Sequence, residues 1–186
     1  MTSTSPPGNR RTLWTAIILV VLVGGAFAAK AIVRAHVDSL IQHAVDQPLP
    51  AFALADRDGR TWTNQDLAGK RALLHFFRSF CGSCDAEAPA IRALEQALPA
   101  DVVLLHVMTD RVLGFDAAKT AATIAHDGFA RPILMADAAF ADALHGVKWS
   151  QVTPITYVVD ARGVVRFGLR GMQTQASIEA ALAAIR

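Results

Sequence analysis

The feature that most constrains the fold is a pair of cysteines placed between an apolar run and a helical pattern. Cys81 and Cys84 are the only two cysteines among 186 residues. The run 72–77 (Ala-Leu-Leu-His-Phe-Phe) has the length of a buried strand, and apolar residues recur at helical spacing across 85–98. The pair therefore lies at a strand-to-helix junction, where the free N–H groups of a helix's first turn stabilise a thiolate.

Two thiols in this setting indicate redox chemistry. A structural zinc site needs about four Cys or His ligands, commonly from a second paired motif, which the sequence lacks. Haem attachment needs a histidine directly after the second cysteine, where this sequence has Asp85. An inert buried pair and a soft-metal site for copper on the same two sulfur atoms stay open as alternatives. On the redox interpretation, we predict that Cys81 is the exposed nucleophile and Cys84 its buried partner.

Charge and composition narrow the class of partner. The formal net charge is +2, and Arg10 and Arg11 account for it, because the rest of the sequence has equal numbers of acidic and basic residues. A neutral domain offers no basic surface for nucleic acid, so no nucleic-acid partner is expected. We also expect no cofactor and no resident metal.

The N-terminal segment predicts export or membrane anchoring. Leu13–Ala29 contains no charged residue and follows two arginines. It is slightly short of the ~20 residues of a typical span, so we predict a span over 12–33 in which Lys30 reaches the membrane surface. The positive-inside tendency then places residues 1–11 in the cytoplasm. A secretory signal cleaved near Ala28 is the rival interpretation. Either way, the domain faces an oxidising compartment.

The rest of the sequence alternates strand and helix patterns. Residues 34–48 are predicted as a juxtamembrane helix and linker that ends at prolines, and 49–186 as the folded domain. The expected elements are a hairpin over 52–63, a helical turn over 66–70, strands over 72–77, 102–108 and 132–135, helices over 85–98, 117–126 and 138–144, a second hairpin over 155–167 and a helix over 177–185. This order predicts an α/β fold with helices on both faces of the sheet.

Several motifs together resemble those of one superfamily. They are Pro-x-Phe-x-Leu and Asp-x-x-Gly within 50–59, Leu-x-Gly-Lys at 67–70, Phe-x-x-x-Cys-x-x-Cys-x-x-Glu-x-Pro at 77–89, and Thr153-Pro154 ahead of a strand. From about Leu49 onward the sequence resembles the thioredoxin superfamily, and specifically its TlpA/ResA-like branch of membrane-anchored thiol-disulfide oxidoreductases. The resemblance implies a thioredoxin-like fold with an N-terminal hairpin extension, preceded by one transmembrane or signal helix.

The resemblance also assigns roles to residues outside the cysteine pair. Thr153 and Pro154 match a cis-proline loop that faces the disulfide and binds the substrate backbone. Glu87 matches the active-site glutamate of the branch. His75 replaces the buried acid that thioredoxins hold six residues before the first cysteine. Either Glu87 or His75 would take the proton of Cys84, since an imidazole titrates near neutrality; a satisfied core histidine and a solvated or capping glutamate are the alternatives.

Three further residues surround the two predicted loops. Phe80 and Trp149 are predicted to present an apolar surface to a protein client, with a place in the core as the alternative. Arg78 is expected to be a solvated charge. It also occupies the position where peroxiredoxins, which share the fold, place Thr or Ser three residues before their reactive cysteine. A peroxidase is therefore disfavoured.

These observations predict a protein disulfide reductase. Cys81 would attack a client disulfide and Cys84 would resolve the mixed disulfide. The resemblance implies an inner-membrane electron donor and a single-pass protein of the bacterial inner membrane with its catalytic domain in the periplasm. Asp85 and Glu87 add negative charge near the thiols, which predicts a Cys81 pKa of about 7 or above and a reducing potential.

Overall fold

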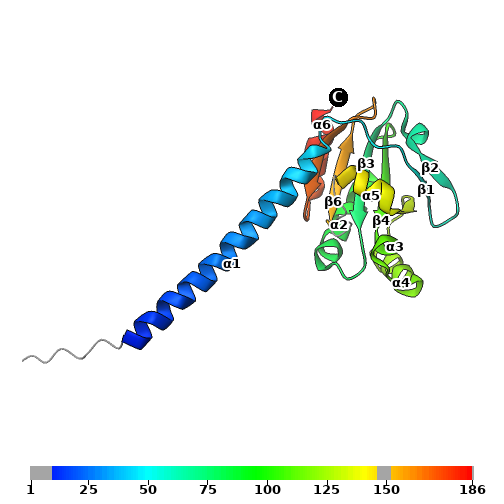
Figure 1. Ribbon diagram of the computed structural model, residues 1–186. Helices are drawn as coiled ribbons and strands as arrows, with labels where there is room; N and C mark the ends of the chain where they lie inside the picture. The colour runs from blue at the N-terminus through cyan, green and yellow to red at the C-terminus, as the bar shows by residue number, and fades with distance from the viewer. Residues whose placement is uncertain (1–9, 146–151, 186) are drawn as a thin grey trace, which may run out of the picture. The chain divides into compact units, whose positions relative to one another are not determined.

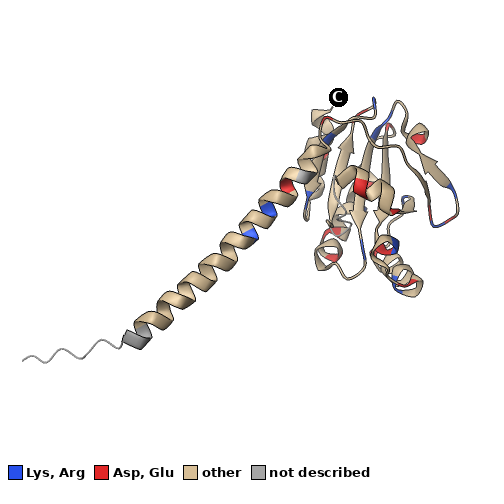
Figure 2. Cartoon of the chain, viewed as in Figure 1, with Lys and Arg blue, Asp and Glu red and all other residues tan. Residues whose placement is uncertain are grey.

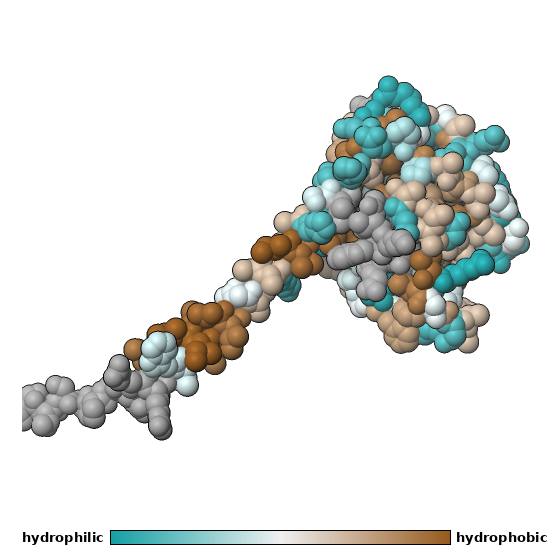
Figure 3. Space-filling model, viewed as in Figure 1, coloured by the Kyte–Doolittle hydropathy of each residue, from teal (hydrophilic) through white to brown (hydrophobic). Residues whose placement is uncertain are grey.

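The computed structural model describes residues 10–145 and 152–185. Its N-terminal part is one long helix. Helix α1 spans Arg10–His43. Its stretch Leu13–His43 is long and apolar enough to cross a membrane, and a signal sequence would pass the same test. From Leu13 to Ala29 the helix has no charged residue. Figure 2 shows a long stretch of it without Lys, Arg, Asp or Glu, and Figure 3 shows hydrophobic side chains on its surface. The predicted apolar helix is present, as a candidate span or signal.

The end of α1 differs from the predicted linker. The polypeptide divides into two compact units at Asp38/Ser39, so the last residues of α1 belong to the C-terminal unit. Ile41 is buried there and lies against Gly168, where a Cβ atom would overlap its side chain. The Asp46 N–H donates to the Val165 carbonyl at 2.8 Å. The prediction of a spacer over 34–48 is therefore wrong in its second half, because a glycine in the sheet makes room for Ile41.

A five-stranded mixed sheet forms the centre of the C-terminal unit, in the order β5-β4-β3-β6-β7 (Figure 1). Strands β3, β4 and β5 are parallel. Strand β6 runs antiparallel to β3, and β7 runs antiparallel to β6. A separate antiparallel hairpin pairs β1 with β2. The bounds are β1 Ala53–Ala55, β2 Thr61–Thr63, β3 Arg71–Phe77, β4 Val102–Met108, β5 Ile133–Met135, β6 Ile155–Val159 and β7 Val165–Arg170.

Helices cover both faces of the sheet, as predicted. Their bounds are η1 Asn64–Leu67, α2 Gly82–Ala97, α3 Asp110–Leu113, α4 Ala117–Asp127, α5 Ala138–His145 and α6 Gln175–Ala184. Every predicted strand and helix is found within a few residues of its expected bounds. The four-residue helix α3 was not predicted, because one helical turn is too short to show a periodic pattern.

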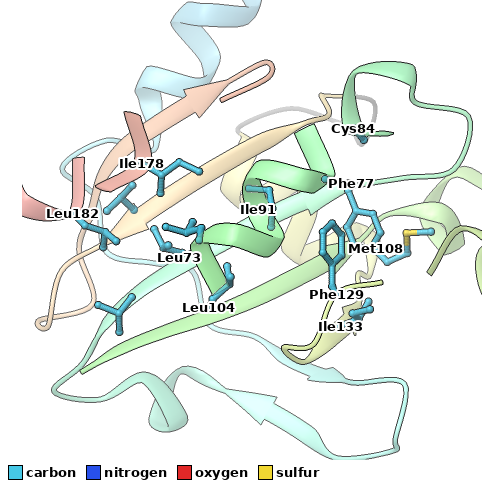
Figure 4. Close-up of a cluster of buried hydrophobic side chains, with 14 of the residues drawn as sticks. Leu73, Phe77, Cys84, Ile91, Leu104, Met108, Phe129, Ile133, Ile178 and Leu182 are labelled. Carbon is cyan, nitrogen blue, oxygen red and sulfur yellow. The ribbon is translucent and has the colours of Figure 1, made fainter. Parts of the chain in front are cut away.

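Strand β3 sits in the middle of the sheet and is buried on both sides. Because side chains alternate along a strand, Leu73, His75 and Phe77 share one face and Phe76 points to the other. Leu73 and Phe77 pack in the core cluster with Ile91 of α2 and Ile178 of α6 (Figure 4). On the opposite face the Phe76 ring lies 6.2 Å from the ring of Phe140 in α5. The alternation therefore points His75 toward α2, the helix that carries the cysteines.

Candidate active site

The two cysteines lie at the N-terminus of α2 and form a disulfide. Cys81 is the N-cap, and its Sγ accepts the N–H of Cys84 at 3.2 Å. The S–S distance is 2.02 Å and the Cα atoms are 5.2 Å apart. Cys81 is 4% exposed and Cys84 3%. In the disulfide form the two sulfur-bearing residues are thus equally buried, and the predicted difference in exposure stays a prediction for the reduced protein.

A buried carboxylate holds the loop that leads into the first cysteine. Asp110 is fully buried and accepts the Ser79 N–H at 2.7 Å and the Ser79 hydroxyl at 2.5 Å. It also accepts the Thr120 hydroxyl at 2.9 Å, which ties the loop to α4. Sequence reasoning missed Asp110. The sequence did hold a positional indication of this contact. Phe77 and Met108 are partners at the ends of the parallel strands β3 and β4, and Ser79 and Asp110 each lie two residues further on.

Phe80 occupies the tip of this loop in a conformation that favours glycine. Its φ angle is +55°, and its side chain is 70% exposed. A non-glycine residue in the left-handed region costs about 1–2 kcal/mol, so the hydrogen bonds on either side of Phe80 must hold this backbone conformation. In this conformation the ring points to solvent. The ring lies 5.5 Å from Phe115, and the Lys119 ammonium lies 4.2 Å from its centre. Trp149, the other predicted client-facing residue, lies outside the described residues.

A second loop faces the disulfide. The Thr153–Pro154 peptide bond is cis, the geometry that the resemblance implies. The Thr153 hydroxyl donates to Cys81 Sγ at 3.7 Å and accepts the Nε–H of Arg78 at 3.1 Å. Arg78 also donates to the Ser79 carbonyl at 3.1 Å. The expectation that Arg78 is a solvated charge is therefore wrong, because its guanidinium links the loops on both sides of Cys81.

Beneath the helix lies a buried set of four ionisable side chains, here named the Glu–His network: Glu87, His75, His106 and Glu95. His75 Nε2 lies 3.2 Å from Glu87 Oε2, and His75 Nδ1 lies 3.0 Å from His106 Nδ1. His106 Nε2 lies 2.9 Å from Glu95 Oε1. All four residues are 7% exposed or less. The structure thus brings together the two predicted proton acceptors, His75 and Glu87, and extends them by two residues.

Backbone groups satisfy both ends of the Glu–His network. Glu87 Oε1 accepts the N–H of Gln173 at 2.7 Å. Glu95 accepts the N–H groups of Ala130 and Arg131, the latter at 2.9 Å. Each carboxylate therefore has hydrogen bonds beyond its histidine, as buried charged groups require.

The surroundings fix the charge at the Glu95 end. Burial lowers the pKa of His106 to about 4, so its ring is neutral at pH 7. The ring stacks on Phe129 with centroids 4.2 Å apart. Burial pushes the pKa of Glu95 upward, but the hydrogen bonds from His106, Arg131 and Ala130 outweigh burial and hold this pKa below its ordinary value. The Glu95 end is thus a carboxylate beside a neutral imidazole.

His106 and Glu95 were not among the site residues that the sequence predicted. The available signal was positional, because His75 and His106 are direct partners in the parallel register of β3 and β4. Two polar residues at the same level of neighbouring apolar strands indicate a contact.

One further cluster could hold a cation. Asp85, His126 and Asp127 place one potential ligand atom each within 4.8 Å of one another, the sole group of this kind in the described residues. Asp127 is buried, and burial, followed by the nearby Asp85, raises its pKa. Neither cysteine belongs to the cluster.

The comparisons with known proteins agree with the predicted fold. The AhpC/TSA family matches residues 45–167, well over half of the sequence. No curated protein matches it. A thioredoxin-family thiol:disulfide interchange protein from Chlorobium tepidum superposes with a TM-score of 0.64 at 20% identity, covering 76% of this chain and 97% of that one.

Other solved structures are similar. The exposed lipoprotein thioredoxin of Streptococcus pneumoniae has a TM-score of 0.62 at 23% identity and covers 73% of this chain and 99% of its own. StoA from Bacillus subtilis has a TM-score of 0.59 at 18% identity, with 74% and 97% covered. At these identities the likeness shows the fold, and the predicted thioredoxin-like fold is confirmed.

Proposed function

The chain belongs to the AhpC/TSA family, and we propose that it is a membrane-anchored thiol-disulfide oxidoreductase that reduces protein disulfides. The observation that carries the proposal is the Cys81–Cys84 disulfide at the N-terminus of α2, opposite the Thr153–Pro154 loop. A disulfide at a helix N-terminus has a thiolate-stabilising environment on one side, and the facing loop offers backbone groups to a client.

The reaction would proceed through a mixed disulfide. The Cys81 thiolate attacks one sulfur of a client disulfide, and the client's other sulfur leaves as a thiolate. The Cys84 thiolate then attacks Cys81 Sγ, which forms the Cys81–Cys84 disulfide and releases the second client thiolate. Two electrons pass from the enzyme to the client. The N–H of Cys84 and the hydroxyl of Thr153, which contact Cys81 Sγ, support its role as nucleophile.

Resolution requires a base for the Cys84 proton. We assign this step to Glu87 and His75, because Glu87 lies one helical turn after Cys84 and contacts His75 in a buried site. A buried acid or base exchanges protons with a neighbouring thiol without competition from water.

Client binding is assigned to the surface around the disulfide. The exposed ring of Phe80 and the Thr153–Pro154 loop would contact the client, with Trp149 as a further predicted contact. An exposed aromatic beside a reactive disulfide favours a protein client, since a large apolar side chain gains most from a large partner surface.

The apolar helix and its flanking charges support a place in the bacterial inner membrane, with the domain in the periplasm. Cleavage near Ala28 would instead release the domain into the same compartment. Electrons would come from an inner-membrane donor. The carboxylates of Asp85 and Glu87 favour a reductase over an oxidant, because negative charge near Cys81 raises the pKa of its thiol.

Two other functions have a specific feature in their favour. The family match favours a thiol peroxidase. Against it, Arg78 occupies the position where peroxiredoxins place Thr or Ser, and its guanidinium is hydrogen-bonded to Thr153. The reduced cysteine pair favours a copper carrier, since thiolates bind soft cations.

The decisive experiment uses the full-length protein in detergent. We expect it to catalyse the reduction of insulin by dithiothreitol, and Cys81→Ser to abolish this activity. Cys84→Ala expressed in the source cell should accumulate a mixed disulfide between Cys81 and its client, identified by mass spectrometry. Consumption of hydrogen peroxide without insulin reduction would establish a peroxidase, and tight copper binding without either activity a carrier.

A further inference from the structure

The Glu–His network needs more protons than its members carry in their ordinary charge states. Its three contacts of 3.2, 3.0 and 2.9 Å each join two atoms that are acceptors when unprotonated. Three hydrogen bonds therefore require three protons. Two neutral imidazoles supply two, and two carboxylates supply none. Since unpaired buried lone pairs are costly, the network holds one excess proton and a net charge of −1.

The position of the excess proton follows from the Glu95 end. Glu95 is a carboxylate that accepts two backbone N–H groups, so the contact with His106 is filled by the Nε2–H of His106. His106 is neutral, and its Nδ1 then carries a lone pair. His75 must donate its Nδ1–H to that lone pair. The third proton lies between His75 Nε2 and Glu87 Oε2, at the end of the network on the cysteine-bearing helix.

We infer that His106 and Glu95 are positioning residues that hold a transferable proton on the His75–Glu87 pair for exchange with Cys84. The inference rests on the proposed function, because it concerns the same disulfide. It goes further in assigning the protonation of the pair to two residues that do not touch the redox centre.

The proton completes the step that reopens the disulfide. A donor thiolate attacks Cys81 Sγ and forms a mixed disulfide, while the Cys81–Cys84 bond breaks and Cys84 leaves with the bonding electron pair. The Cys84 thiolate takes the proton from the His75–Glu87 pair, and the network passes from −1 to −2. In the reverse step Cys84 returns the proton to the pair as it attacks Cys81. The buried charge of −2 favours that return.

Neighbouring groups complete the electrostatic setting. The charge of Asp127 in α4 interacts electrostatically with His75, and the charge of Arg131, which follows α4, interacts with His106. Asp85 and His126 lie beside Asp127. These groups are unchanged in the variants below.

His106→Phe tests the inference without opening a cavity. With no nitrogen opposite it, His75 Nδ1 has no hydrogen bond to make, and the single proton of a neutral His75 suffices for the contact with Glu87. This variant removes the excess proton. In Glu95→Gln the amide oxygen can take the place of Oε1, which faces His106 Nε2 and accepts the N–H groups of Ala130 and Arg131, so this variant should keep the direction of all three hydrogen bonds.

The matched control is His145→Asn. His145 is as buried as His75, at 1% exposed, but its Nδ1 contacts Tyr157 Oη at 2.8 Å and it lies outside the Glu–His network. The loss of a buried histidine as such is therefore common to control and test, whereas the loss of the transferable proton is not.

The first measurement is the rate at which dithiothreitol opens the disulfide of the full-length oxidised protein, by stopped flow from about pH 6 to 8. The thiolate fraction of dithiothreitol is the same for every variant and cancels in rate ratios. Because general acids accelerate such steps by about 10²–10⁴, we expect His106→Phe to be about tenfold slower or more at pH 7 and Glu95→Gln to stay close to the wild type. His145→Asn should match the wild type.

The second measurement locates the proton by NMR of ¹⁵N-histidine-labelled protein. The wild type should show a proton on His75 Nδ1 coupled across the hydrogen bond to His106 Nδ1, and Glu95→Gln should show it on the same atom. A proton on His106 Nδ1 in the wild type, or an unchanged opening rate in His106→Phe, would overturn the inference. A wild type that shows the expected donor but never exchanges disulfides would overturn the proposed function and leave the hydrogen-bond assignment standing.

Discussion

His145 should make the stability of the domain depend on pH in a defined window. It closes α5 and is 1% exposed, and burial lowers its pKa to about 4 from 6.5. Burial also raises the pKa of Tyr157, so the phenol stays protonated and donates to His145 Nδ1. Protonating the ring would place a charge in the core and remove this acceptor.

The sign and size of the effect follow from linkage. Between pH 6.5 and 4 the unfolded chain binds a proton on His145 that the folded protein excludes, so stability is fully present above about pH 6.5 and falls toward pH 4. A pKa difference of this size corresponds to about 3 kcal/mol, at about 1.4 kcal/mol per pH unit inside the window. This is a large share of the 5–15 kcal/mol typical of a domain.

The assay is urea unfolding of the full-length protein and of His145→Asn, in non-ionic detergent from about pH 7.5 to 4, followed by circular dichroism. Asparagine keeps an oxygen acceptor for Tyr157 but does not titrate. All other groups titrate in both proteins, so the difference in unfolding free energy isolates His145. We expect this difference to fall by about 3 kcal/mol as the pH is lowered. A difference that stays constant would refute the reasoning.

Other predictions concern the loops, the cysteines and the N-terminal helix. Asp110→Asn should lower the unfolding free energy by about 3 kcal/mol in the same urea assay, because it leaves buried donors facing an amide. Thr153→Val should raise the Cys81 pKa by about 0.7, measured by the pH dependence of iodoacetamide labelling, since a hydrogen bond of about 1 kcal/mol to the sulfur is lost. In the reduced wild type Cys81 should be labelled much faster than Cys84, and the reverse order would overturn their assigned roles. Intact mass of membrane-extracted protein should give the full chain, whereas a start after Ala28 would establish a cleaved signal.

The fold could be predicted from the sequence where the patterns were long. The largely apolar runs 72–77 and 102–108 predicted strands, and the structure places them side by side in the sheet as β3 and β4, with β3 in the middle. Helix α3 escaped because four residues carry no period. The continuation of α1 into the C-terminal unit depends on the contact of Ile41 with Gly168, which two distant stretches of sequence do not reveal.

The candidate site divides in the same way. The cysteine pair, Glu87 and the Thr153–Pro154 loop were found because they belong to local motifs. His106, Glu95 and Asp110 were missed because their roles depend on the register between β3 and β4 and on the rotation of α2 against the sheet. Arg78 was misjudged because its partner, Thr153, lies 75 residues away in the sequence.

The Glu–His network shows how a single departure from the family pattern propagates through a core. Where thioredoxins hold a buried acid, this chain has His75, whose ring presents two nitrogen atoms on opposite sides. Burial obliges both to find partners, and they are Glu87 on α2 and His106 on β4. His106 brings a second nitrogen with the same requirement, which Glu95 meets. The need for further side-chain partners ends at Glu95, because backbone N–H groups donate to its oxygen atoms, and every residue other than proline carries such a group. An acid in place of His75 alone would leave a carboxylate facing the lone pair of His106 Nδ1, so the network depends on the imidazole at this position.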